Sequence, residues 1–218
     1  MGFEYLTNVP LAQARKEYLE RLVSGGFGSK TETIPVFESC GRVTAKAVYA
    51  HICAPHYAAS AMDGVAVSAK ETFGATETTP VTLKPDQFLV LDTGDPIPED
   101  KDAVIMVEDI VKNGDGSITI HAAAAPWQHI RQIGEDICAG EMILPSHMTV
   151  SPAAIGAMIA GGVLEIEVIR KPVVGIIPTG DEIIPPCTDP KPGDILEFNG
   201  SIFSAMVRSW GAEAVVYP

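Results

Sequence analysis

Apolar residues recur at helical spacing near the N-terminus of the 218-residue chain. The spacing predicts a helix over residues 10–23, with one apolar face formed by Leu11, Ala14, Tyr18 and Leu22. The glycine-rich stretch "SGGFGSK" is typical of a segment that ends such a helix.

Two further helices are predicted later in the chain. The stretch "SPAAIGAMIAGG" has Ser151 as an N-cap, a proline in the first turn, and Gly161 or Gly162 as a stop. The stretch "NGSIFSAMVRSWG" predicts a helix that begins at Asn199 or Ser201 and ends by Gly211.

Between residues 51 and 140 the pattern changes to short segments rich in β-branched residues. The stretches "GVAVSA", "QFLVLDTG", "AVIMVEDI" and "SITIHA" predict strands, and "NGDG" at residues 113–116 predicts a hairpin turn. This region is therefore predicted to form a compact β-rich domain inserted after the N-terminal helix.

The last fifty residues predict the beginning of a parallel sheet. Residues 173–177 are almost all apolar, which is typical of a strand that is buried on both faces. A helix and a second apolar strand, "AEAVVYP", follow, so the order is βαβ. One such unit cannot cover both faces of a sheet, and we expect the chain to be a fragment, or its sheet to be completed by another segment or chain.

The composition and charge of the chain limit the classes of binding partner that we expect. The formal net charge is −13 and the pI is about 4.7, so neither nucleic acid nor an anionic membrane is an expected partner. The N-terminus lacks the basic and apolar regions of a signal peptide, and the four cysteines form no C-x-x-C pair. We expect reduced thiols and a cytoplasmic protein.

Three acidic stretches lie where strands begin or end, beside glycine and threonine. They are "SAMDGVA" with Asp63, "LDTGDPIP" with Thr93, and "PTGDEI" with Asp181 and Glu182. Carboxylates bind hard cations such as Mg²⁺, and glycine lets a ligand approach the backbone. The alternative is that these are ordinary turns, and for any one of them it is the stronger reading. "PTGDEI" is favoured as a site because ligands gather at the carboxyl ends of parallel strands.

A fourth stretch, "HIRQIGEDI", contains Arg131 and Asp136. Arginine can bind an anion through two parallel hydrogen bonds, and the alternative is a surface turn with a weak ion pair. The His51, Cys53 and His56 spacing lacks a fourth metal ligand and is interpreted as incidental.

In this order, these stretches resemble one family along nearly the whole chain. "ASAMDGVAV" is similar to its Ser-x-x-Asp-Gly-Tyr-Ala element, and "DTGDPIPEDKDAVIMVED" to its Thr-Gly-Ala-x-x-Pro segment. "HIRQIGEDICAGEMIL" is similar to its Asn-Ile-Arg-x-x-Gly-Glu-Asp element, and "VIRKPVVGIIPTGDEI" followed by "PGDILEFNGSI" to its Thr-Gly-Asp-Glu-Leu region. The family is the molybdopterin molybdenumtransferases, which include MoeA and the gephyrin E domain.

The resemblance implies an α+β multidomain fold. Residues 1–50 and 141–170 would form a linker domain of helices and strands. Residues 51–140 would form the inserted β-rich domain. Residues 171–218 would be the start of an α/β domain like molybdopterin-binding proteins, with only its first βαβ unit present.

The resemblance also implies an enzyme that inserts molybdate into the dithiolene of adenylated molybdopterin, with Mg²⁺ and release of AMP. It implies a homodimer with the site between subunits, and a molybdopterin adenylyltransferase as the upstream partner. The 218-residue piece alone is expected to be inactive.

Residue by residue, the resemblance implies two groups of site positions. The catalytic positions are Asp63, Thr93, Asp136 and Glu182, and Asp63 and Glu182 also bind the metal. The substrate-binding positions are Arg131, Thr179, Gly180, Asp181 and Asn199.

Three positions depart from the family pattern. Val65 stands in place of an aromatic residue, so one wall of the cleft is expected to be less bulky; Asp95 adds negative charge; and His129 replaces asparagine. Three alternatives therefore stay open: a non-catalytic binding or scaffold module, a paralogue that acts on another anionic substrate, and a metal-dependent phosphohydrolase.

Overall fold

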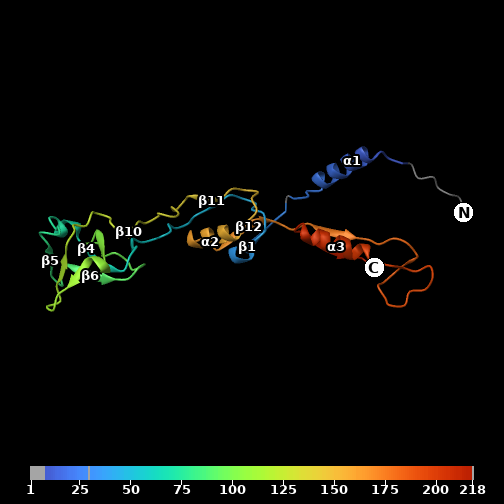
Figure 1. Cartoon of the computed structure of the whole chain (residues 1–218). Coiled ribbons are helices and arrows are strands. Elements are labelled where there is room, and N and C mark those ends of the chain that lie inside the picture. Colours follow the sequence, from blue (N-terminus) through green and yellow to red (C-terminus); the bar gives the residue numbers. More distant parts are fainter. Residues whose placement is uncertain (1–7, 29, 218) are drawn as a thin grey trace. The chain divides into compact units, whose positions relative to one another are not determined.

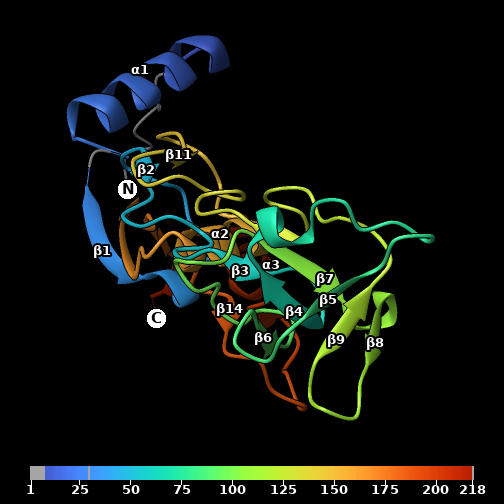
Figure 2. The same cartoon turned by 90° about the vertical axis from the view of Figure 1, so that its left-hand side faces the viewer.

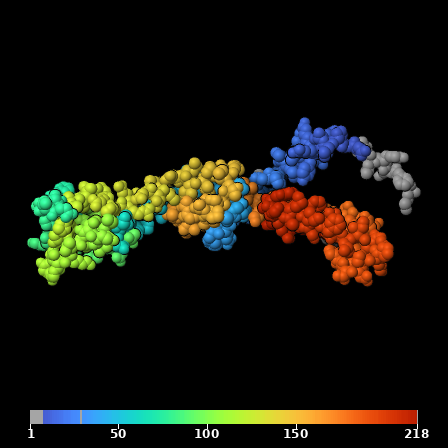
Figure 3. Space-filling model, viewed as in Figure 1, coloured from blue at the N-terminus to red at the C-terminus, as the bar shows by residue number. Residues whose placement is uncertain are grey.

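The computed structural model describes residues 8–28 and 30–217. These residues fall into two units, each described here by itself. The first unit contains the described residues of Met1–Val48, Leu144–Ile155 and Glu165–Pro218. The second unit contains Tyr49–Ile143 and Gly156–Leu164, and the colours of Figure 3 let each segment be followed by residue number.

The core of the second unit is an antiparallel sheet of three strands. Its order is β6-β4-β7, and the strands are β4 (Gly64–Val67), β6 (Phe88–Leu91) and β7 (Ala103–Met106). Figure 2 shows β4 beside β6 and β7. All four residues of β4 are buried, and the strand predicted from "GVAVSA" is confirmed.

Both faces of β4 are covered because its side chains alternate between two apolar clusters. Val65 and Val67 pack in the larger cluster, with Leu83, Ile105 and Ile120 among its members. The side chain of Ala66 belongs to a second cluster, with Leu91, Val104 and Ile130.

A second antiparallel sheet completes the β-rich region, in the order β5-β9-β8. Its strands are β5 (Val81–Leu83), β8 (Ile110–Lys112) and β9 (Ile118–Ile120). Strands β8 and β9 are joined by the predicted hairpin, which the Asn113 N–H closes by donating to the Ser117 carbonyl oxygen at 2.9 Å. The predicted hairpin is therefore confirmed.

Two short strands position the candidate site. Strand β3 (Ala59–Ser60) pairs antiparallel with β10 (Ile130–Arg131), and Arg131 stands opposite Ala59. The second unit also contains two 3₁₀ turns, η2 (Ala69–Thr72) and η3 (Val107–Asp109).

In the first unit, the predicted N-terminal helix is confirmed as α1 (Leu11–Ser24), which has no buried residue. Beyond it, β1 (Thr31–Pro35) leads into the short 3₁₀ turn η1 (Val36–Glu38) and pairs antiparallel with β12 (Glu165–Ile169). Figure 1 shows β1 and β12 together, although their sequences are far apart.

The helix predicted from "SPAAIGAMIAGG" is α2 (Pro152–Ala160). The Ser151 hydroxyl oxygen accepts a hydrogen bond from the Ala154 N–H at 3.2 Å, as an N-cap residue does, so the predicted cap is confirmed. The chain passes between the two units at four points, of which two lie in strands β2 (Val48–Tyr49) and β11 (Met142–Leu144). The other two lie within α2 and just before β12.

The predicted βαβ order is confirmed near the C-terminal end. Strand β13 (Val173–Ile176) pairs parallel with β16 (Glu213–Val216), and α3 (Asn199–Ser209) lies between them in sequence. The short strands β14 (Ile183–Ile184) and β15 (Ile195–Leu196) also pair parallel.

One expectation for this region is wrong. Strand β13 is not buried on both faces, because within the described chain β16 is its single strand neighbour and Val173 is 59% exposed. Helix α3 begins at Asn199, one of the two starting residues predicted. The carboxylate of Glu197 takes the cap's role by accepting a hydrogen bond from the Gly200 N–H at 2.6 Å.

One prediction from composition can be compared with the structure. All four cysteines are free thiols, as expected. Within residues 8–28 and 30–217, we find no helix that combines the length and the hydropathy needed to cross a bilayer.

Candidate functional site

Asp63 and Thr93, two of the predicted catalytic residues, are in direct contact. The Oδ1 atom of Asp63 accepts hydrogen bonds from the Thr93 backbone N–H and from the Thr93 hydroxyl, each 2.7 Å long. These two bonds hold the pKa of the Asp63 carboxyl below its ordinary value of 3.8, and the bond from the hydroxyl has the larger effect. Asp63 is therefore an oriented anion at neutral pH, exposed to solvent and available to a cation.

The residue after Asp63 has to be glycine for a steric reason. A Cβ atom built on Gly64 would lie 2.0 Å from the backbone carbonyl oxygen of Ile105 on β7. The Asp63 carbonyl oxygen also accepts a hydrogen bond from the Val107 N–H at 3.0 Å. The Asp-Gly pair thus allows β4 to approach β7 closely, and the carboxylate stands at the edge of that contact.

Thr93 is placed by the tight turn that follows β6. The Asp95 N–H donates to the Asp92 carbonyl oxygen at 3.1 Å, and Gly94 has a φ of 93°, a conformation that favours glycine. The carboxylate of Asp95 closes the same turn by accepting from the Asp92 N–H at 2.9 Å. Asp95, a departure from the family pattern, therefore serves as a local backbone cap.

Ser60 connects this turn to the loop that carries Asp63. Its N–H donates to the Asp95 carbonyl oxygen and its carbonyl accepts from the Gly94 N–H, both at 2.9 Å. Its hydroxyl, which is fully buried, donates to the Met62 carbonyl oxygen. The motif "ASAMDGVAV" contains Ser60, but the sequence predicted no role for it, because hydrogen bonds made through a backbone leave no signal in the residue type.

Arg131 and Asp136 are also brought together. Their Nη2 and Oδ2 atoms are 2.7 Å apart, and Glu135 lies 3.6 Å from the Arg131 Nε atom. The bond to Asp136, followed by the charges of both acids, raises the pKa of Arg131 above its ordinary value. Through the pairing of β10 with β3, Arg131 stands one residue from the strand position of Ser60.

His129 lies at the start of the same segment in an unusual backbone conformation. Its φ is 54°, in the left-handed region where Asn, Asp and His are the most common non-glycine residues. Its carbonyl oxygen accepts from the Ala61 N–H at 2.9 Å, which ties this segment to the Asp63 loop. The family's asparagine at this position suits the same conformation.

One expectation about the site is wrong. Val65 was expected to line the cleft, but its side chain is 1% exposed and packs in the larger apolar cluster. Strand alternation sends it inward, so an aromatic residue there changes core packing and not an exposed wall.

The remaining predicted site residues lie in the first unit. Thr179, Gly180, Asp181 and Glu182 form an exposed turn before β14, and the Glu182 carboxylate lies against the backbone of Gly180, whose φ is 142°. Asn199 is exposed at the start of α3. Asp63 and Glu182 thus belong to different units, and their assignment as one metal pair stays a prediction.

A resident metal would have few protein ligands here. Among the described residues, no group of three or more His, Cys, Asp or Glu side chains is arranged to hold a metal ion. The donor set around Asp63 still fits Mg²⁺, which commonly binds one or two carboxylates together with substrate phosphate and water.

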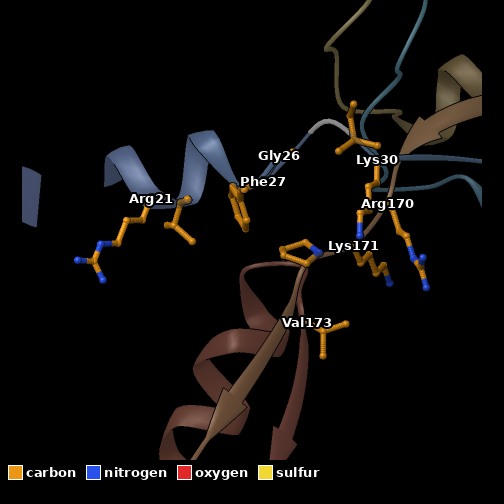
Figure 4. Close-up of a pocket in the computed structure, with 12 residues that line it drawn as sticks. Arg21, Gly26, Phe27, Lys30, Arg170, Lys171 and Val173 are labelled. Atoms are coloured by element: carbon orange, nitrogen blue, oxygen red, sulfur yellow. The ribbon is translucent and has the colours of Figure 1, made fainter. Parts of the chain in front are cut away.

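A separate hollow of about 580 Å³ lies in the first unit. Figure 4 shows Phe27 beyond the end of α1, and Lys30, Arg170 and Lys171 around the segment that leads into β13. Such a lining of cations and apolar side chains suits an anionic group. None of the predicted site residues is among the residues that line the hollow.

The chain folds into a mixture of helices and small sheets. Its candidate site contains the Asp63 carboxylate, which is oriented by two hydrogen bonds from Thr93. Residues 9–162 match the family described as "MoeA N-terminal region (domain I and II)". The chain belongs to this family, as the resemblance predicted.

Curated relatives and solved structures agree. The chain is 36% identical over 199 residues to "Molybdopterin molybdenumtransferase 2" of Mycobacterium tuberculosis, covering 84% of this chain and 49% of that protein. It is 33% identical over 217 residues to "Molybdopterin molybdenumtransferase" of Haemophilus influenzae, covering 94% and 53%. A crystal structure of a "molybdopterin biosynthesis moea protein" from Pyrococcus horikosii superposes with a TM-score of 0.79 at 30% identity, covering 96% and 56%.

The chain spans about half the length of the curated relatives it matches. Both of these relatives are named as molybdenumtransferases.

Proposed function

We propose that this chain supplies the N-terminal part of a molybdopterin molybdenumtransferase, which inserts molybdenum from molybdate into adenylated molybdopterin and releases AMP. The observation that carries the proposal is the Asp63–Thr93 contact, which occurs within the family match. The cytoplasm is the inferred location. The three-part domain division given above is part of the same proposal.

In this proposal, Asp63 binds a divalent cation through the oxygen that Thr93 does not occupy. Both hydrogen bonds from Thr93 end on Oδ1 and the Asp63 residue is exposed, so Oδ2 is the oxygen proposed to bind the ligand. Asp63 would hold Mg²⁺, and the ion would supply positive charge where the adenylate is hydrolysed. Thr93 keeps the carboxylate ionised and oriented.

Arg131 has the role of binding an anionic part of the substrate, and Asp136 orients its guanidinium. The bond between them leaves further N–H donors of the guanidinium to face solvent, since a guanidinium has five. Thr179, Gly180, Asp181, Glu182 and Asn199 are proposed to contact the pterin phosphate or the metal from the second subunit of a homodimer. A molybdopterin adenylyltransferase is the inferred upstream partner.

The test is a turnover assay on the full-length protein that contains this chain, with adenylated molybdopterin, molybdate and Mg²⁺. Asp63→Asn keeps the shape of the side chain and the acceptor for Thr93, but it removes the negative charge. We expect the rate of molybdenum insertion to fall by about 100-fold or more, with the unfolding midpoint unchanged.

Asp86→Asn is a matched control, because it makes the same chemical change at an exposed position on another turn. Wild-type turnover by Asp63→Asn would remove the proposed role of Asp63. An absence of turnover in the wild-type protein, with molybdopterin still bound, would favour the scaffold alternative.

A further inference from the structure

Cys53 and Cys138 are 85 positions apart in sequence but stand opposite each other in the second unit. Their neighbours Ala54 and Ile137 form an antiparallel bridge and exchange hydrogen bonds of 2.8 Å and 3.1 Å. Cys53 precedes Ala54, and Cys138 follows Ile137, so the two cysteines form the next cross-strand pair.

This position is geometrically suited to a disulfide. A pair that flanks a doubly hydrogen-bonded pair has its Cα atoms roughly 4.5 Å apart. Disulfides span Cα separations of about 4.4–6.8 Å. The backbone therefore does not have to move far for the two sulfur atoms to bond.

The sulfur atoms themselves border one small space beside Gly134. A Cβ atom built on Gly134 would lie 2.9 Å from the Cys138 Sγ and 3.6 Å from the Cys53 Sγ. Gly134 also has a φ of 74°, so glycine is favoured there by both conformation and space. The missing side chain at Gly134 leaves room for the two thiols to meet.

Both thiols have only weak partners. The Cys138 S–H donates to the Gly134 carbonyl oxygen at 3.4 Å, and the Cys53 Sγ accepts from the Ala139 N–H at 3.3 Å. Cys138 is exposed and Cys53 is half-buried, so a reagent reaches Cys138 first. These sulfur contacts are weak and are easily exchanged for a covalent bond.

We propose that Cys53 and Cys138 are a reversible redox pair that low-molecular-weight disulfides oxidise to an intramolecular disulfide. The Cys138 thiolate attacks one sulfur of the reagent, forms a mixed disulfide and releases one reagent thiolate. The Cys53 thiolate then attacks the Cys138 sulfur and releases the second thiolate. Two protein thiols are oxidised and one reagent disulfide is reduced, while the two protons pass to the released thiolates.

The disulfide would tie the segment that ends at Ala54 to the segment that carries Arg131 and Asp136. In proteins of reducing compartments, disulfides of this kind are transient and act in redox sensing. The proposed pair is thus a modification site distinct from the carboxylate of Asp63.

The experiment uses the full 218-residue chain with Cys40→Ser and Cys187→Ser, so that Cys53 and Cys138 are the remaining thiols. The folded protein is incubated with oxidised glutathione, free thiols are counted by maleimide labelling, and digested peptides are analysed by mass spectrometry. We expect both thiols to be lost, the peptides of Cys53 and Cys138 to be linked, and dithiothreitol to reverse the change.

Replacement of one cysteine of the pair provides a second measurement. With Cys53→Ser added, Cys138 should stop at a stable mixed disulfide with glutathione, because the resolving thiol is missing. In the protein that keeps both cysteines, retention of both free thiols, or a mixed disulfide on Cys138 that persists, would overturn the proposal. None of these readings requires molybdopterin, so the result is independent of the proposed enzymatic function.

Discussion

Thr93 donates two hydrogen bonds to a single carboxylate oxygen of Asp63, one from its backbone and one from its hydroxyl, each 2.7 Å long. This arrangement fixes one oxygen of a carboxylate on an exposed residue and does not use the other. It also makes the ionisation of Asp63 dependent on Thr93, which can be measured without substrate.

Replacement of Thr93 by valine should raise the pKa of Asp63 toward 3.8. Valine has nearly the shape of threonine but lacks the hydroxyl, which is the largest cause of the lowered pKa; the backbone bond remains. The pKa is measured by NMR from the chemical shift of the Asp63 carboxyl carbon between about pH 2 and 6, a range that includes the ordinary pKa of aspartate.

The sign of the linked stability follows from this shift. Because folding lowers the pKa of Asp63, its hydrogen bonds stabilise the protein above pH 3.8, and this contribution is lost as the pH falls through the folded pKa. The wild type and Thr93→Val should therefore differ more in stability at pH 7 than at low pH. Thr82→Val is the matched control, and an equal Asp63 pKa in all three proteins would contradict the prediction.

Replacement of Gly64 by alanine should destabilise the second unit. The added Cβ would lie 2.0 Å from the carbonyl oxygen of Ile105, and a backbone atom cannot move aside as a flexible side chain can. We expect the free energy of unfolding to fall by about 2 kcal/mol or more, as measured by urea denaturation.

Gly114→Ala is the control for this change, because a Cβ at Gly114 would have no heavy atom within 4 Å and its φ is not positive. It should alter the free energy of unfolding by less than about 0.5 kcal/mol. Similar values for the two variants would show that β4 and β7 are not in the close contact described.

The sequence was sufficient to predict most of the elements of this fold. The three helices and the hairpin at Asn113 have periodicity and turn residues that act locally, and α2 also has the Ser151 cap, so their signals are readable in sequence. The burial of β13 was predicted wrongly, since burial depends on neighbours that a strand's own sequence does not contain.

The part of the site that short sequence motifs contain could be predicted. The motifs brought out Asp63, Thr93 and Arg131, but the steric need for Gly64 and the buried backbone role of Ser60 come from strands distant in sequence. Likewise, the meeting of Cys53 with Cys138 depends on the register of two segments, which no spacing rule along the chain reveals.

Replacement of Arg131 by lysine should weaken substrate binding without changing the stability of the fold. Lysine keeps the charge but loses the planar fork that holds Asp136 and that, in the proposed function, also binds an anion. In the full-length protein, we expect the affinity for adenylated molybdopterin to fall by about tenfold. The unfolding midpoint should not change, since the Arg131–Asp136 pair is exposed to solvent.

Calorimetric titration and thermal unfolding measure the two effects on the same samples. Arg15→Lys, an exposed change on α1, is the matched control and should leave both unchanged. Unaltered affinity in Arg131→Lys would argue that Arg131 and Asp136 form only a surface ion pair.

The left-handed backbone of His129 leads to a prediction in which one substitution is harmless and another is not. His129→Asn should leave the free energy of unfolding unchanged or raise it by a few tenths of a kcal/mol, because asparagine adopts a φ of 54° readily. His129→Val should lower it by about 1–2 kcal/mol, since a β-branched residue is strained in this region. The same pair of changes at His56, which is not in the left-handed region, corrects for the loss of the imidazole. If valine and asparagine at position 129 proved equally stable, backbone strain could not be the reason that the family's asparagine fits here.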